Sequence, residues 1–152
     1  MKPVTIQIRD QLTAKPNAAI CTIRPDQTVA DAVRELCRHG IGSLLVVDGE
    51  GRPVGIITER DVLRTANRDL KSFGDLAVSQ VMSSDLICGL PDDDPQYVMQ
   101  VMTQNRIRHL PIVEDNRLVG VISIGDVIKS QLEATRVENH MLKDYLHLRG
   151  EL

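Results

Sequence analysis

Ile107-Arg-His-Leu-Pro-Ile-Val-Glu-Asp-Asn-Arg-Leu-Val-Gly-Val-Ile-Ser-Ile-Gly-Asp-Val-Ile128 is the most informative stretch of this chain. Two short apolar runs, 110–113 and 118–122, flank a polar turn at 114–117. Apolar runs of this length on both sides of a polar turn are typical of a β-hairpin. A hydroxyl residue followed shortly by Gly-Asp is typical of a helix start. The stretch therefore predicts a strand, a turn, a second strand and a helix.

The chain contains this pattern twice. Its earlier occurrence, at 41–63, has apolar runs at 44–47 and 54–57 around a turn at 48–53. The offset between the copies is 66 before the turns and 65 after them, because the first copy has one extra residue between Val47 and Gly55. Self-similarity at a long fixed period indicates paired units that share a core. The corresponding residues after the turns are Gly55 and Gly120, Thr58 and Ser123, Asp61 and Asp126, and Val62 and Val127.

Each copy is expected to follow the order β-α-β-β-α, which predicts an α+β protein. One copy of about 60 residues buries too little surface to be stable alone, so we expect the two copies to pack as a pseudo-two-fold pair. The stretch 67–80 has no counterpart in the strand-helix pattern, so we interpret it as a connector between the copies. The predicted organisation is an N-terminal segment with a short helix at 1–17, a first repeat at 18–66, a connector at 67–80, a second repeat at 81–130 and a C-terminal helix at 131–152.

Local signals place the first two helices. Thr28 is expected to cap a helix that ends at Gly40, a residue suited to the left-handed position after the last turn. A second helix is expected from 61 to 68, with Val62 and Leu63 facing inwards. The apolar stripe of the first helix consists of Val29, Ala32, Val33 and Leu36.

A further apolar stripe lies beyond the second copy. Its residues fall three or four apart, with charged residues elsewhere on the helix. Such a stripe either packs back on its own chain or pairs with a second subunit, and the pattern favours a homodimer. The stripe consists of Ala134, Val137, Met141, Tyr145 and Leu148.

Composition excludes several classes of function. The formal net charge is −3, and one Phe, two Tyr and no Trp offer no stacking surface, so we expect no nucleic-acid role. No apolar run approaches the roughly 18 residues of a membrane span, and residues 1–15 lack the apolar core of a signal peptide. The expected location is the cytoplasm.

The two helix starts carry the residues with chemical potential. Thr58 with Asp61, and Ser123 with Asp126, each place a hydroxyl, free backbone amides and a carboxylate at a helix N-terminus. Amides and a hydroxyl suit a phosphate, and a carboxylate accepts from both hydroxyls of a diol. Together they describe a ribonucleotide site. Alternatively, these residues are only helix caps.

Basic residues accompany the second of these steps. Arg108 and His109 precede the apolar run at 110–113, where they are expected at the same edge as Ser123 and can hold an anion. Alternatively, they are a solvated charge and a semi-buried imidazole. The first copy has Gly42 and Ser43 there, so its grip on phosphate should be weaker unless Arg60 compensates.

The chain has two Gly-h-h-Thr/Ser-x-x-Asp steps (h is an apolar residue), a Leu-Pro-Ile-Val-Glu strand and Pro-Asp helix starts. In these features it resembles the paired cystathionine-beta-synthase (CBS) domains. The resemblance covers about residues 18–130 and is to the stand-alone pairs. It implies two clefts between the repeats, which bind AMP, ADP, ATP, NAD or S-adenosylmethionine, and an association of two pairs.

The resemblance also implies roles for single residues. Asp126 is expected to hold ribose, with Ser123, Arg108 and His109 near phosphate. The expected ligand-binding residues of the first cleft are Ser123, Asp126, Arg108, His109, Ile122, Cys21, Thr22, Ile41 and Gly42. Those of the second cleft are Thr58, Asp61, Arg60, Ser43, Ile87 and Ile107.

These observations favour a non-catalytic regulatory sensor of adenosine nucleotides, which acts on an unknown protein target and needs no catalytic cofactor. The alternative is a structural dimerisation module with vestigial clefts. The sequence has no metal-ligand cluster, no catalytic triad in a recognisable context and no phosphate-binding Gly-rich loop, so we expect neither catalytic residues nor a metal site.

Overall fold

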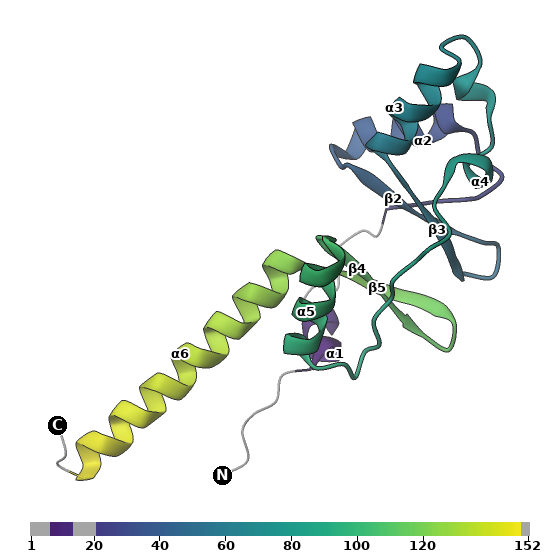
Figure 1. Cartoon of the computed structure of the whole chain (residues 1–152). Coiled ribbons are helices and arrows are strands. Elements are labelled where there is room, and N and C mark those ends of the chain that lie inside the picture. The colour runs from purple at the N-terminus through teal and green to yellow at the C-terminus, as the bar shows by residue number, and fades with distance from the viewer. Residues whose placement is uncertain (1–6, 14–20, 150–152) are drawn as a thin grey trace. The chain divides into compact units, whose positions relative to one another are not determined.

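The computed structural model describes residues 7–13 and 21–149 (Figure 1). The chain forms two compact units. One, the repeat-1 unit, consists of residues 19–88 and 113–119, and the other, the repeat-2 unit, of residues 1–18, 89–112 and 120–152. Each unit is built around one copy of the sequence pattern.

The repeat-1 unit contains a three-stranded sheet. Its strands follow the order β1-β2-β3, with β1 parallel to β2 and β2 antiparallel to β3. Ser43 is paired with Thr58 at the end of the hairpin. The elements are β1 (Thr22–Ile23), α2 (Val29–His39), β2 (Ser43–Val47), β3 (Pro53–Thr58), α3 (Glu59–Arg68), the 3-10 helix η1 (Phe73–Asp75) and α4 (Val78–Val81). The predicted order β-α-β-β-α is confirmed in this copy.

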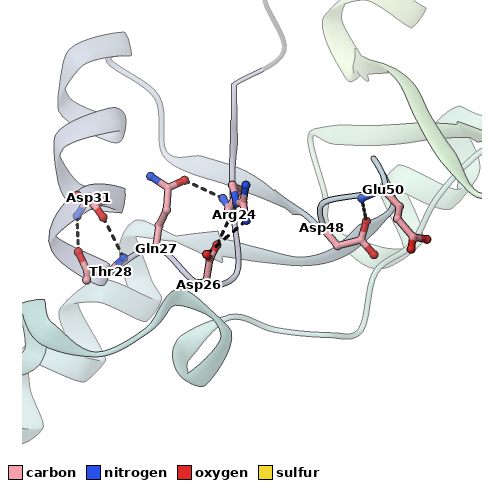
Figure 2. Close-up of polar contacts among 7 residues, drawn as sticks. All are labelled: Arg24, Asp26, Gln27, Thr28, Asp31, Asp48 and Glu50. Atoms are coloured by element: carbon pink, nitrogen blue, oxygen red, sulfur yellow. Dashed lines mark hydrogen bonds and ion pairs between the residues drawn. The ribbon is translucent and has the colours of Figure 1, made fainter.

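Thr28 caps α2 as predicted. The Thr28 hydroxyl accepts from the Asp31 backbone N–H at 3.2 Å, and the Asp31 carboxylate accepts from the Thr28 backbone N–H at 3.1 Å (Figure 2). This reciprocal pair satisfies two of the free donors at the helix start. The core beside α2 is formed by Ile23, Ala32, Leu36, Leu44, Val46, Ile57 and Val78.

The prediction that Leu63 faces inwards is wrong. Its side chain is 70% exposed, and no residue of α3 is fully buried. Val62 packs against the core of the repeat-1 unit. The next residue lies about 100° further round the helix, so both cannot face the same core.

The repeat-2 unit follows the same plan. Gly89 forms a single parallel bridge to Ile112, at the positions that correspond to the β1–β2 pair Ile23 and Val46. Strands β4 and β5 pair with each other. The elements are α1 (Ile8–Thr13), α5 (Pro95–Asn105), β4 (His109–Glu114), β5 (Arg117–Ser123) and α6 (Ile124–Arg149). Fully or almost fully buried side chains are Ile8, Val98, Met102, Leu110, Ile112, Ile122 and Val127.

The first helix of each repeat ends in a left-handed residue. Gly40 after α2 has φ +60°, and Arg106 after α5 has φ +54°. Each donates its backbone N–H to the last carbonyls of its helix, and the next residue, Ile41 or Ile107, donates to the carbonyl five positions before it. The duplication thus extends to backbone detail, although only the first copy has the residue type that this conformation favours.

A short helix packs on each repeat from outside the predicted β-α-β-β-α order. In the repeat-1 unit, Val78 of α4 donates its backbone N–H to the Gln27 carbonyl at 2.8 Å. In the repeat-2 unit, Ile8 of α1 donates in the same way to the Asp93 carbonyl at 3.4 Å. Both side chains are fully buried. Helix α4 at the end of the predicted connector 67–80 is therefore the counterpart of α1.

These short helices also explain the glycines that begin the duplicated motif. A Cβ on Gly55 would lie 2.9 Å from the backbone oxygen of Ser83, just after α4. A Cβ on Gly120 would collide with the Leu12 side chain of α1. Glycine lets the chain after α4 pass close to β3 in the first copy and leaves room for the Leu12 side chain beside β5 in the second. The short helix predicted in the N-terminal segment 1–17 is α1, and residues 1–6 and 14–17 of that segment lie outside the described residues.

Helix α6 is continuous across 131, where the sequence predicts a separate segment. It runs without a break from Ile124 to Arg149, and it contacts α5 and α1. Val137, Met141 and Tyr145 are each more than half exposed, so their packing back on the described chain is excluded. No helix in the described ranges combines the length and apolar character of a membrane span.

Candidate functional site

The start of α6 gathers four of the predicted residues. The Ser123 hydroxyl accepts from the Asp126 backbone N–H at 3.1 Å. The Ile124 backbone N–H donates to the Arg108 carbonyl at 2.8 Å, which fixes the beginning of β4 beside the helix N-terminus. His109 follows as the first residue of β4. A hydroxyl, a carboxylate and two basic side chains thus come from one end of the β4–β5 hairpin.

This end of the repeat-2 unit is suited to an anion. Arg108 and His109 are exposed, and so is Arg106 in the preceding turn. Within residues 7–13 and 21–149, none of the three side chains has an ion pair. The N-terminus of a long helix adds a partial positive charge. Basic groups without carboxylate partners, next to a helix N-terminus, are available to a phosphate.

The equivalent start of α3 has a hydrogen-bond network between Thr58 and Asp61. The Asp61 carboxylate accepts from the Thr58 backbone N–H at 2.9 Å and from the Thr58 hydroxyl at 2.9 Å. The same hydroxyl accepts from the Asp61 backbone N–H at 3.2 Å. Thr58 and Asp61 therefore do cap α3, as the alternative interpretation expects. Their capping uses the hydroxyl proton and one carboxylate oxygen.

The two helix starts differ most in the residue that follows the capping hydroxyl, which is Glu59 in the first copy and Ile124 in the second. Glu59 donates its backbone N–H to the Gly42 carbonyl at 3.0 Å, as Ile124 does to Arg108. Its carboxylate stays close, because a Cβ on Gly42 would lie 3.5 Å from Glu59 Oε1. The first copy therefore has a carboxylate where the second copy has an apolar side chain beside an arginine. Arg60 is exposed and has no ion pair in the described ranges.

The remaining predicted residues divide between the units. In the repeat-1 unit, Thr22 is exposed at the start of β1, and Cys21, Ile41 and Ile87 are half-buried. Ile87 precedes Cys88, whose thiol pKa is raised by burial. In the repeat-2 unit, Ile107 is half-buried. Ile122 is only 3% exposed, so its side chain belongs to the core.

Sequence reasoning overlooked Glu59 as a site residue and the left-handed turn at Arg106. Glu59 directly follows the hydroxyl residue of the motif, so the sequence shows that a negative charge lies at the helix start. The sequence does not show that the Glu59 side chain points towards Gly42. Arg106 occupies the position in the second copy that corresponds to Gly40, and this correspondence was the available signal. In the described part of the chain, no three His, Cys, Asp or Glu side chains are grouped to hold a metal ion.

Comparison with known proteins agrees with the duplicated architecture. The family model described as "CBS domain" matches residues 12–68 and again 78–133. The chain belongs to the CBS-domain family. This CBS pair has the α+β fold predicted from its sequence, with a C-terminal helix beyond the second repeat. Its first matched range begins inside α1, and its second begins with α4.

Individual relatives include stand-alone CBS proteins. The chain is 39% identical over 125 residues to the mitochondrial CBS domain-containing protein CBSX3 of Arabidopsis thaliana. The aligned region covers 80% of this chain and 61% of that protein. The crystal structure of ATU1752 from Agrobacterium tumefaciens is similar with a TM-score of 0.71 and 31% identity, over 86% of this chain and 97% of that one.

A third similar structure contains ligands. The CBS domain pair of protein MJ0100 matches with a TM-score of 0.66 and 26% identity, over 87% of this chain and 98% of that chain. It is a complex with 5′-methylthioadenosine and S-adenosyl-L-methionine. Both compounds contain adenosine.

Proposed function

We propose that this CBS pair is a non-catalytic regulatory module that binds an adenosine-containing ligand of the AMP, ADP, ATP, NAD or S-adenosylmethionine class. The observation that carries the proposal is the start of α6, where Ser123 and Asp126 meet exposed Arg108 and His109. The adenosine compounds bound by the CBS pair of MJ0100 support the ligand class. No residue is proposed to be catalytic.

Each group at this helix start has a role in the proposal. The Asp126 carboxylate accepts hydrogen bonds from the ribose hydroxyls, and Arg108 donates to the phosphate. Ser123 accepts from Asp126 through its oxygen, so its own hydroxyl proton is available to a phosphate oxygen. His109 adds a further hydrogen-bond donor from its imidazole ring.

The ligand is proposed to occupy the α6 site before the α3 site. The Thr58 hydroxyl proton is already donated to Asp61, whereas no described residue accepts the Ser123 proton. The Glu59 carboxylate beside Gly42 repels an anion, and Arg108 attracts one. We therefore expect one stronger and one weaker site per chain.

The regulatory output follows from differential affinity. A ligand shifts an equilibrium between arrangements of repeats or subunits only as far as it binds one arrangement more tightly. We propose that the module acts as a homodimer and passes this shift to a protein target. The exposed apolar residues of α6 support the dimer.

A structural dimerisation module with vestigial sites is the second candidate. The observation that favours it is the capping role of Thr58 with Asp61 and of Ser123. If capping is the whole purpose of these residues, the protein dimerises without any response to nucleotides.

Isothermal titration calorimetry with AMP, ATP, NAD and S-adenosylmethionine separates the two candidates. We expect saturable heat with at least one ligand. Loss of a hydrogen bond to a charged group costs about 1.5–3 kcal/mol, so Asp126→Ala is expected to weaken binding at least about tenfold. Glu138→Ala, which removes a carboxylate elsewhere on α6, is the matched control. Absence of heat from the wild-type protein at millimolar ligand would exclude the sensor function.

A further inference from the structure

We propose that the distal part of α6 pairs with the α6 of a second copy in antiparallel orientation, centred on Met141. The proposal deepens the homodimer of the proposed function by naming its contact surface, and it does not depend on nucleotide binding. The apolar residues of this surface, the α6 stripe, are half-buried Ala134 and exposed Val137, Met141, Tyr145 and Leu148.

Four of the five residues of the α6 stripe are largely exposed in the described chain. Val137 and Met141 are 53% exposed, Tyr145 is 56% exposed, and Leu148 is 87% exposed. The stripe spans 15 positions, about 22 Å of helix. Large apolar side chains in a continuous row mark an interaction surface, and Met and Tyr are enriched in protein interfaces.

The spacing of the α6 stripe indicates the partner. Its successive steps are three, four, four and three residues, so the row is the same when read from either end. A two-fold axis that reverses the helix direction maps such a row onto itself, as a self-complementary dimer interface requires. A second copy of this chain is therefore the occupant that the spacing fits.

Side-chain sizes fit the antiparallel register. With Met141 opposite the partner's Met141, Val137 lies opposite the partner's Tyr145. Ala134 lies opposite the partner's Leu148. Each outer layer then combines a small side chain with a large one, which lets facing positions interdigitate. A parallel pair would instead place Tyr145 against its own copy and leave Ala134 opposite alanine.

Charges also favour the antiparallel pair. Consider two α6 helices that run parallel and in register. Glu133 of one helix and the partner's Glu138, five positions further along, then lie at the edge of the apolar row, where the side chains of paired helices meet. Two carboxylates there repel each other. The antiparallel pair separates these residues and brings Glu133 to the level of the partner's His147, which can donate a hydrogen bond to it.

Sedimentation equilibrium of Met141→Asp tests the surface. Both Met141 and the control position Lys143 are exposed on α6, so neither substitution disturbs the fold, and circular dichroism checks this. Lys143 lies about 200° round the helix from Met141. We expect Met141→Asp to weaken dimerisation at least about 30-fold, as a central interface residue does, and Lys143→Asp to leave it unchanged. A Met141→Asp protein that stays as dimeric as the wild type would overturn the proposal.

Cysteine cross-linking tests the orientation. Ala134→Cys and Leu148→Cys proteins are mixed, oxidised and digested, and mass spectrometry identifies the linked peptides, which separates them from links through native cysteines. The antiparallel pair predicts disulfides between positions 134 and 148 and self-linking of Met141→Cys. Self-linking at position 134 would show a parallel pair. These results are independent of nucleotide heat, so failure of the dimer surface and failure of the sensor function remain distinguishable.

Discussion

Single residues show that the two copies of the motif share a backbone plan but not its chemistry. The left-handed position after the first helix is Gly40 in one copy and Arg106 in the other. The residue beside the preceding strand is Glu59 in one and Ile124 in the other. We expect these differences to give the repeats unequal local stability and unequal affinity for anions.

Arg106→Gly is expected to stabilise the protein. A residue with a Cβ in the left-handed conformation costs about 1 kcal/mol relative to glycine, and Arg106 has φ +54°. We expect the free energy of unfolding, measured in urea, to rise by up to about 1 kcal/mol. Gly40→Ala is the reverse substitution at the equivalent position and should lower it. An unchanged or lower stability of Arg106→Gly would contradict this account of the turn.

The Asp31 cap makes a pH-dependent contribution. The hydrogen bond from the Thr28 backbone N–H, followed by that from the Thr28 hydroxyl, lowers the pKa of Asp31 below its ordinary 3.8. A carboxyl whose pKa is lower in the folded state stabilises the protein above its unfolded pKa, and this contribution disappears as the pH falls through the folded value. The melting temperature of Asp31→Asn should lie below that of the wild type at pH 7, with the gap shrinking below about pH 4. A gap that stayed constant to pH 2 would assign the effect to something other than the ionised cap.

Elements separate what the sequence could predict from what it could not. The order β-α-β-β-α was readable because apolar runs, polar turns and caps are local signals that occur twice. The elements against which α1 and α4 pack could not be predicted, because helices of one or two turns show little hydrophobic periodicity. The contact between Ile8 and Asp93 joins the N-terminal segment to the second repeat, across the whole of the first.

The direction of side chains was the second limit of sequence reasoning. Leu63 and Val62 are both apolar, and only the packing of α3 decides that Val62 faces the core. At the candidate site, Ser123 and Asp126 were predicted from the duplicated step, and Arg108 with His109 from their place before the apolar run at 110–113. The carboxylate of Glu59 beside Gly42 needed the backbone path.

Ile8→Ala tests whether α1 is an integral part of the fold. The Ile8 side chain is fully buried in the repeat-2 unit, and truncation of such a residue to alanine costs about 2–5 kcal/mol. We expect the midpoint of urea unfolding to fall accordingly. Leu70→Ala, at a position that is 78% exposed, should change it little. Equal effects of the two substitutions would mean that α1 does not stay packed in solution.

The whole molecule contains the same arrangement of helices and strands twice. The side chains beside the two helix starts differ in charge, with basic residues in one copy and a carboxylate in the other. The copy with Arg108 and His109 is prepared for a phosphate, and the copy with Glu59 opposes one. Differences at a few residues within two matched CBS repeats would therefore account for the proposed two sites of unequal strength.

Glu59→Gln should strengthen the weaker site. Removing one charge at about 4 Å in water is worth about 1 kcal/mol, so calorimetry with AMP should show a second-site affinity about fivefold higher. Glu50→Gln removes the same charge from the exposed turn between β2 and β3 and should leave both sites unchanged. If the two variants behaved alike, the proposed repulsion at Gly42 would be refuted.

Amide chemical shifts during a titration with AMP test the central claim most directly. The account predicts that the backbone amides of Ile124, Gly125 and Asp126 shift first and saturate, and that those of Glu59, Arg60 and Asp61 follow only at higher AMP. Absence of shifts at both helix starts, or earlier shifts at 59–61, would contradict the assignment of the α6 start as the nucleotide site.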